Sequence, residues 1–179
     1  MLAIIRNDHA NINQLLSILR KKIIRLEQDE KIDYRLIKAM ITYLREYSDK
    51  YHHPMEDLIY EYYLKYRVVP DEVANRLSRE HKLISKATIE LDELLDMILL
   101  DAIVPKEHCI KKLNDFVKFQ SAHLAYEEQE VLPAIKESLS PDDWSTLQQQ
   151  WLHDEYSDPL FGDTISDQYR ELADRINQG

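Results

Sequence analysis

Two stretches of this chain place a histidine four residues before a glutamate, His52 with Glu56 and His123 with Glu127. On an α-helix this spacing stacks the two side chains on one face. An imidazole and a carboxylate side by side can both bind a borderline metal ion such as iron, manganese or zinc. A single pair would say little, because both residue types are common on solvated helix faces. Two matched pairs are a much stronger signal.

Each pair follows a further histidine that comes directly after an acidic residue, in Asp8-His9 and in Glu80-His81. These upstream histidines stand 43 and 42 residues before the histidines of their pairs. Self-similarity on this scale predicts that the chain contains two related helical hairpins. The sequence therefore predicts a metal site built from two similar halves.

Bulk properties limit the class of protein. The 179 residues include two glycines and six prolines, which favours helix nearly throughout one domain. A net charge of -10 argues against a nucleic-acid partner, which needs a basic surface. Cys109 is the only cysteine, so no disulfide framework is expected, and a cytoplasmic location fits. No apolar run is long enough to predict a membrane span.

Polar turns at residues 27–33, 67–71 and 101–105 separate four long runs that carry apolar residues at helical spacing. The predicted fold class is all-α, an up-down-up-down four-helix bundle over residues 1–138. A short helical C-terminal extension, residues 139–179, is expected to pack on the bundle.

Prolines mark two further features. Ser140 followed by Pro141 predicts the N-cap and first position of a short helix, and a last helix is expected over residues 164–176. Pro54 removes a backbone donor inside the second long helix, so we expect a kink between His52 and Glu56.

The turns give a geometric test. The midpoint between His9 and His52 falls in the first predicted turn, and that between His81 and His123 falls in the third. An antiparallel bundle would then hold all four histidines at one level, within about a helical turn or ~5 Å. We expect two metal ions there, each bound by two histidines, with both glutamates bridging them.

At this point the sequence resembles the hemerythrin-like, or HHE cation-binding, family over about residues 1–138. The resemblance implies a non-haem di-iron centre with a carboxylate- and oxo/hydroxo-bridged pair of iron ions, zinc or manganese being the other candidates. The matching motifs, carried over residue by residue, imply these metal ligands: His9, His52, Glu56, His81, His123 and Glu127.

The sequence departs from the oxygen-carrying hemerythrins, which have a His-xxx-His pair on the third helix. Leu77 and Ser85 stand four residues either side of His81, so neither supplies a fifth imidazole. The pattern resembles the bacterial four-histidine, two-glutamate branch, associated with sensing of small molecules and with repair of damaged iron centres. We expect a protein that binds or senses O2 or NO, or handles iron.

Other functions stay open. A di-iron enzyme, either an oxidase or peroxidase or a nitric-oxide-linked repair factor, would use the same ligands and could take peroxide as a partner. Homodimerisation is possible. A histidine phosphotransfer domain fits poorly, because it needs one exposed histidine. A ferritin-like bundle also fits poorly, because its motif places glutamate before histidine.

Several neighbouring residues have expected places. A position about 100° round the helix from His52 puts His53 outside the metal ligands, the alternative being that it serves as a reserve ligand. Asp8 and Glu80 either cap helices or hold an imidazole ring, and Glu128 is expected to face solvent. The remaining expectations are exposure for His108 and His153, a core position for Cys109, and either an outer role or bundle-end exposure for Glu130.

Overall fold

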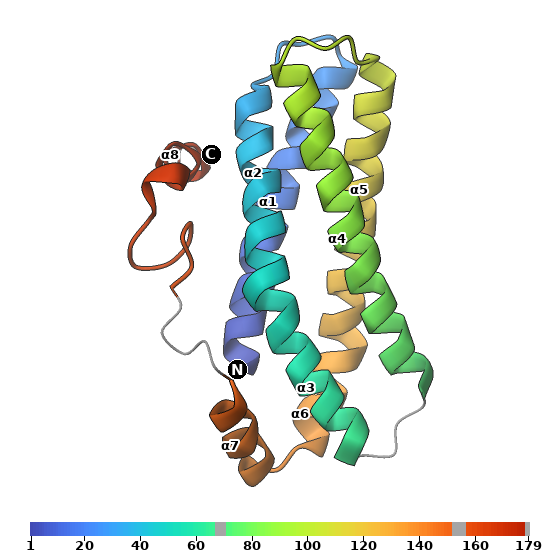
Figure 1. Ribbon diagram of the computed structural model, residues 1–179, viewed down its shortest axis with the longest axis vertical. Coiled ribbons are helices and arrows are strands. Elements are labelled where there is room, and N and C mark those ends of the chain that lie inside the picture. Colours follow the sequence, from blue (N-terminus) through green and yellow to red (C-terminus); the bar gives the residue numbers. More distant parts are fainter. Residues whose placement is uncertain (67–70, 152–156, 178–179) are drawn as a thin grey trace.

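Four long helical runs, each antiparallel to the next in sequence, make up most of the computed structural model, which describes residues 1–66, 71–151 and 157–177 (Figure 1). The predicted all-α bundle is confirmed. Within the described ranges no helix is long and apolar enough to cross a membrane. The runs are α1 (Leu2–Glu27), α2 (Tyr34–Tyr47) continued through the π-helical turn η1 (Ser48–His52) into α3 (His53–Tyr66), α4 (Asp71–Leu99), and α5 (Lys106–Tyr126) continued through the π-helical turn η2 (Glu127–Val131) into α6 (Leu132–Ser138).

The two hairpins, α1 with α2 and α4 with α5, turn in the same way. Asp29 and Asp101 follow the last turns of α1 and α4, and both have a φ of 59°. The amide after each aspartate donates to a carbonyl in the preceding helix, at 2.9 Å in both hairpins. This left-handed ending satisfies carbonyls that the helix leaves free. Lys106 pairs with Asp29 and ties the two turns together at one end of the bundle.

The apolar core has two parts with a polar layer between them. Along α1, Ile12 belongs to the part near the hairpin turns and Ile5 to the part near α6, while the buried Asp8 and His9 lie between. The second run repeats the pattern, with Tyr47 in the first part and Met55 in the second. The bundle therefore carries its polar residues at one level, with apolar packing above and below.

Helix α7 (Pro141–Gln150) begins as the sequence predicts. The Ser140 side chain accepts a hydrogen bond from the Asp143 amide, and Asp143 accepts one from the Ser140 amide in return. Pro141 occupies the first turn of the helix. Leu147 packs into the second part of the core, and the Tyr62 hydroxyl of α3 donates to Asp143 at 2.8 Å. These contacts place α7 against the end of α3 (Figure 1).

The last helix, α8 (Arg170–Asn177), begins later than expected, after the short 3-10 turn η3 (Asp167–Tyr169). Residues 164–166 are not helical, because Ser166 adopts an extended conformation and its amide donates back to Pro159. Segment 157–177 packs against α2 through Tyr43, whose hydroxyl donates to Asp158 at 2.8 Å. The division of the chain at residue 138 stays a prediction.

The left-handed turn gives a first testable prediction. Replacing Asp101 by valine should lower the free energy of unfolding by about 1–2 kcal/mol relative to glycine, because a β-branched residue is strained at positive φ. Chemical denaturation would measure the difference. The same two changes at Ala102, which has no positive φ, are the control. A valine-to-glycine difference that is equal at both positions would contradict this account of the turn.

Candidate metal centre

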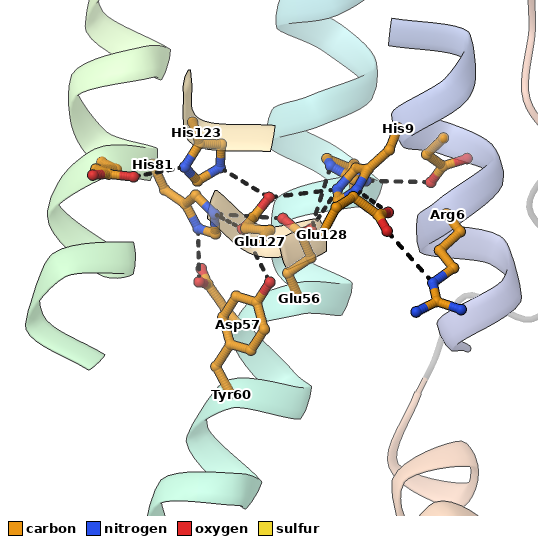
Figure 2. Close-up of polar contacts among 12 residues, drawn as sticks. Arg6, His9, Glu56, Asp57, Tyr60, His81, His123, Glu127 and Glu128 are labelled. Atoms are coloured by element: carbon orange, nitrogen blue, oxygen red, sulfur yellow. Dashed lines mark hydrogen bonds and ion pairs between the residues drawn. The ribbon is translucent and has the colours of Figure 1, made fainter. Parts of the chain in front are cut away.

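The six residues predicted to bind metal converge in the polar layer, all with 6% exposure or less (Figure 2). The ring centroids of His9 and His52 lie 5.0 Å apart, and those of His81 and His123 also lie 5.0 Å apart. The helical levels inferred from the turns are thus found in the structure. The six predicted ligands come from all four helical runs: His9 from α1, His52 from η1, Glu56 from α3, His81 from α4, His123 from α5 and Glu127 from η2.

Glu56 lies between histidines of both hairpins. Its Oε1 is 3.0 Å from Nε2 of His9 and 3.5 Å from Nε2 of His52. Its Oε2 is 3.4 Å from Nε2 of His81. The two oxygens of one carboxylate therefore face two different groups of imidazoles.

Glu127 has the matching place on the other hairpin. Its Oε2 is 3.4 Å from Nε2 of His9 and 3.3 Å from Nε2 of His123, and its Oε1 is 3.5 Å from Nε2 of His81. The hydroxyl of Tyr60, which was not among the predicted site residues, donates to Oε1 at 3.0 Å. Both glutamates thus contact imidazoles of both hairpins.

Buried polar atoms without a hydrogen bond show that these residues suit a cation. Ligand atoms of His9, His52 and Glu56 lie within 4.8 Å of one another, as do those of a second set that shares Glu56. Leaving buried nitrogens and oxygens unsatisfied is costly unless they bind an ion. Among the described residues, six such atoms belong to this site: Nε2 of His52, His53, His81 and His123, and Oε2 of Glu56 and Glu127; the other two are Nδ2 of Asn11 and Oε1 of Gln120.

The pKa values also indicate a site that favours positive charge. Burial lowers the pKa of His9, but Glu56, Glu127 and Glu128 outweigh it and raise that pKa to about 9. Burial likewise lowers the pKa of His81, and its carboxylate neighbours raise it to about 12. The carboxylates thus stabilise a cation in their midst, a role that metal ions would fill.

Four of the rings turn their Nδ1 atoms outward to a carboxylate, which leaves Nε2 directed inward. Metal-bound histidines usually have such a partner, because it fixes the ring's tautomer and orientation. Of the two expectations for Asp8 and Glu80, the structure supports the one in which they hold an imidazole. The pairs are Glu128 with His9 at 2.8 Å, Asp8 with His52 at 3.3 Å, Asp57 with His81 at 2.9 Å and Glu80 with His123 at 2.9 Å.

These contacts follow the repeat. In each hairpin, the acid before the first histidine (Asp8 or Glu80) accepts a hydrogen bond from the second histidine of the same hairpin (His52 or His123). The acid after each glutamate, in Glu56-Asp57 and Glu127-Glu128, holds the first histidine of the other hairpin. The matching acidic doublets were the sequence signal for Asp57 and Glu128, which the sequence analysis did not place in the site.

The expectation that Glu128 faces solvent is wrong. Its side chain is 34% exposed, and it accepts a hydrogen bond from His9 while pairing with Arg6 at 3.5 Å. Arg6 and Arg76 have corresponding roles, because Arg76 donates to Glu80 at 2.8 Å, the carboxylate that holds His123. The arginines thus orient carboxylates that in turn orient imidazoles, as Figure 2 shows for Arg6, Glu128 and His9.

His53 lies in the polar layer, beside the predicted ligands. His53 is 5% exposed, and its ring stacks on that of His81 with centroids 4.3 Å apart and planes 16° apart. The rotation of about 100° from His52 turns His53 away from α1 and towards the histidines of α4 and α5. Consecutive histidines therefore face the two halves of the site.

The helix departs from regular α-helical geometry ahead of Pro54. The π-helical turn η1 ends at His52, and regular helix resumes at His53. The other hairpin repeats this arrangement, since η2 ends two residues before Pro133. A proline cannot donate to the preceding turn and its ring crowds that turn, so a wider turn ahead of it removes the conflict.

Other sequence expectations have plain outcomes. His108 is exposed and Cys109 is buried in the core, as predicted, and Glu130 is exposed at the surface of η2. His153 lies outside the described residues.

Together, the helical bundle and its buried cluster of histidines and carboxylates define a metal-binding protein. Its family follows from comparison with known proteins. The sequence profile of the hemerythrin HHE cation binding domain matches residues 1–135, so the chain belongs to that family. No curated protein and no solved structure matched the chain.

The contact between Glu128 and His9 gives a prediction that separates a ring-holding role from simple charge. Replacing Glu128 by alanine should weaken metal binding about 10- to 100-fold, because His9 loses the partner that fixes its ring. Titration against a competing chelator would measure the affinity. Glu130→Ala removes the same charge from an exposed position of η2 and is the control. Equal affinities of the two variants would show that Glu128 does not act through His9.

Proposed function

We propose that this protein binds two iron ions in the polar layer and uses them to bind or sense a small diatomic molecule, O2 or NO. The observation that carries the proposal is the pair of buried glutamates, each with oxygens near imidazoles of both hairpins. The ligand atoms fall into two sets that share Glu56, which suits two bridged ions better than one. The proposed ligands are His9, His52, Glu56, His81, His123 and Glu127.

Mixed imidazole and carboxylate ligands favour iron, with zinc and manganese as alternatives. Bound iron would supply open coordination positions and a reversible change of oxidation state. The chain's own part is to fix the ligands and to limit access. Asp8, Asp57, Glu80 and Glu128 hold the rings, and the apolar packing on both sides of the layer favours a small, uncharged molecule over a charged one.

A di-iron enzyme is the second candidate, and one contact favours it. The buried hydroxyl of Tyr60 donates to Glu127, so a proton-bearing group touches a proposed bridging ligand. Burial and the neighbouring carboxylates Glu56 and Glu127 raise the pKa of Tyr60 well above its ordinary value, which keeps the phenol protonated. An oxidase or peroxidase would need such a proton near the metals.

Metal content tests the proposal directly. After anaerobic reconstitution, we expect about two iron ions per chain. Glu56→Ala and Glu127→Ala should each weaken the binding of both ions. The loss of affinity should exceed the ~10- to 100-fold that loss of a carboxylate partner of a bound histidine costs. Glu61→Ala removes an exposed carboxylate from the same helix as Glu56 and should leave the content unchanged. One equivalent or less in the unaltered protein would overturn the two-iron proposal.

Gas binding separates the binding protein from the enzyme. Addition of O2 or NO to the reduced, iron-loaded protein should change its absorption spectrum, and removal of the gas should reverse the change. The iron-depleted Glu56→Ala variant is the matched control. Sustained consumption of peroxide or NO with a reductant, abolished in that variant, would favour the enzyme instead. No spectral change and no turnover would contradict both.

A further inference from the structure

His53 stands in the metal centre although neither the six-ligand pattern nor the helical spacing predicts it there. One ligand atom each from His53, Glu56, His81 and His123 lies within 4.8 Å of the others, and all four residues are buried. Across the described residues, Nε2 of His53 has no hydrogen bond. A buried imidazole nitrogen without a partner is costly, so its position among three other ligands calls for a function.

The repeat shows what is unusual about this residue. His52 and His123 are equivalent in the two hairpins, so the residue that corresponds to His53 is Leu124. Leu124 is buried in the apolar core, which shows that a helix of this bundle accepts an apolar residue at the equivalent position. Packing alone therefore does not explain a histidine at position 53.

We propose that His53 binds metal through Nε2, so that one ion receives imidazoles from His53, His81 and His123 and the other from His9 and His52. The proposal rests on the two-iron site described above and deepens it. The fifth imidazole comes from the second helical run rather than from the third. Since the carboxylates are shared, the extra ring makes the two ions chemically different.

The surroundings of His53 leave Nε2 facing the other ligands, with the ring stacked on that of His81 at 4.3 Å between centroids. The Asp49 carboxylate lies 3.8 Å from Nδ1, on the side away from Nε2. Asp49 also accepts a hydrogen bond from Ser85 of α4 at 3.1 Å. His53 thus has a carboxylate on its outer side, at a longer distance than the hydrogen-bonded carboxylates of the other four histidines.

Cobalt(II) offers a direct count of bound imidazoles. In proton NMR of the protein loaded with cobalt(II), the ring N–H of each coordinated histidine gives a strongly shifted, solvent-exchangeable resonance. We expect five such resonances in the unaltered protein, from the five histidines of the two ligand sets. His53→Asn should show four, because asparagine can approach Asp49 but does not reach the position of Nε2. His108→Asn alters an exposed histidine and should keep five.

Stepwise titration with cobalt(II) gives a second readout. His53→Asn should weaken one of the two binding steps at least ~10-fold and leave the other unchanged, because it removes a ligand from one ion only. Thermal unfolding of the metal-free variants checks that they fold. Two bound ions but only four resonances in the unaltered protein would overturn the role of His53 alone. Fewer than two bound ions would overturn the two-metal site itself.

Discussion

The burial of Glu56 and Glu127 among imidazoles, halfway along an apolar bundle, is the constraint on which the rest of the structure depends. Two carboxylates with 0% exposure would be very costly without positive charge beside them. The neighbouring histidines His52, His81 and His9 answer this need in part: burial raises the pKa of Glu56, but they hold it well below its ordinary value. Metal cations would answer the need more completely, because they would also bind the nitrogens and oxygens that hydrogen bonds leave unsatisfied.

The two hairpins meet this requirement by the same means. Each hairpin contributes an acid before its first histidine and an acid after its glutamate. The acids before the histidines hydrogen-bond to a histidine of their own hairpin. The acids after the glutamates hydrogen-bond to a histidine of the other hairpin. The site therefore also fastens the hairpins to each other. Since Glu128 and Asp57 hold His9 and His81 across that boundary, neither half of the site is complete on its own.

The bundle was predictable because its signals are local. Apolar spacing defines helices, and turn positions define which residues share a level, so the meeting of His9, His52, His81 and His123 followed from the numbering. The places of His53 and Glu128 did not follow. A helical angle says how far His53 is turned from His52, but not that α4 and α5 lie in that direction. Likewise, the partner of Glu128 belongs to the other hairpin, a contact that no spacing within one helix reveals.

The remaining differences between the halves are concentrated on one side of the site. His53 stacks on His81, and Tyr60 bonds to Glu127 beside that same histidine. The residues at the equivalent positions of the second hairpin are Leu124 and Val131, both buried and apolar. A duplicated motif provides two matched buried carboxylates, and substitutions at two positions then give the halves different polarity. The asymmetry thus arises from single side chains on a symmetric frame, which lets the chemistry on one side of the site vary while the bundle is unchanged.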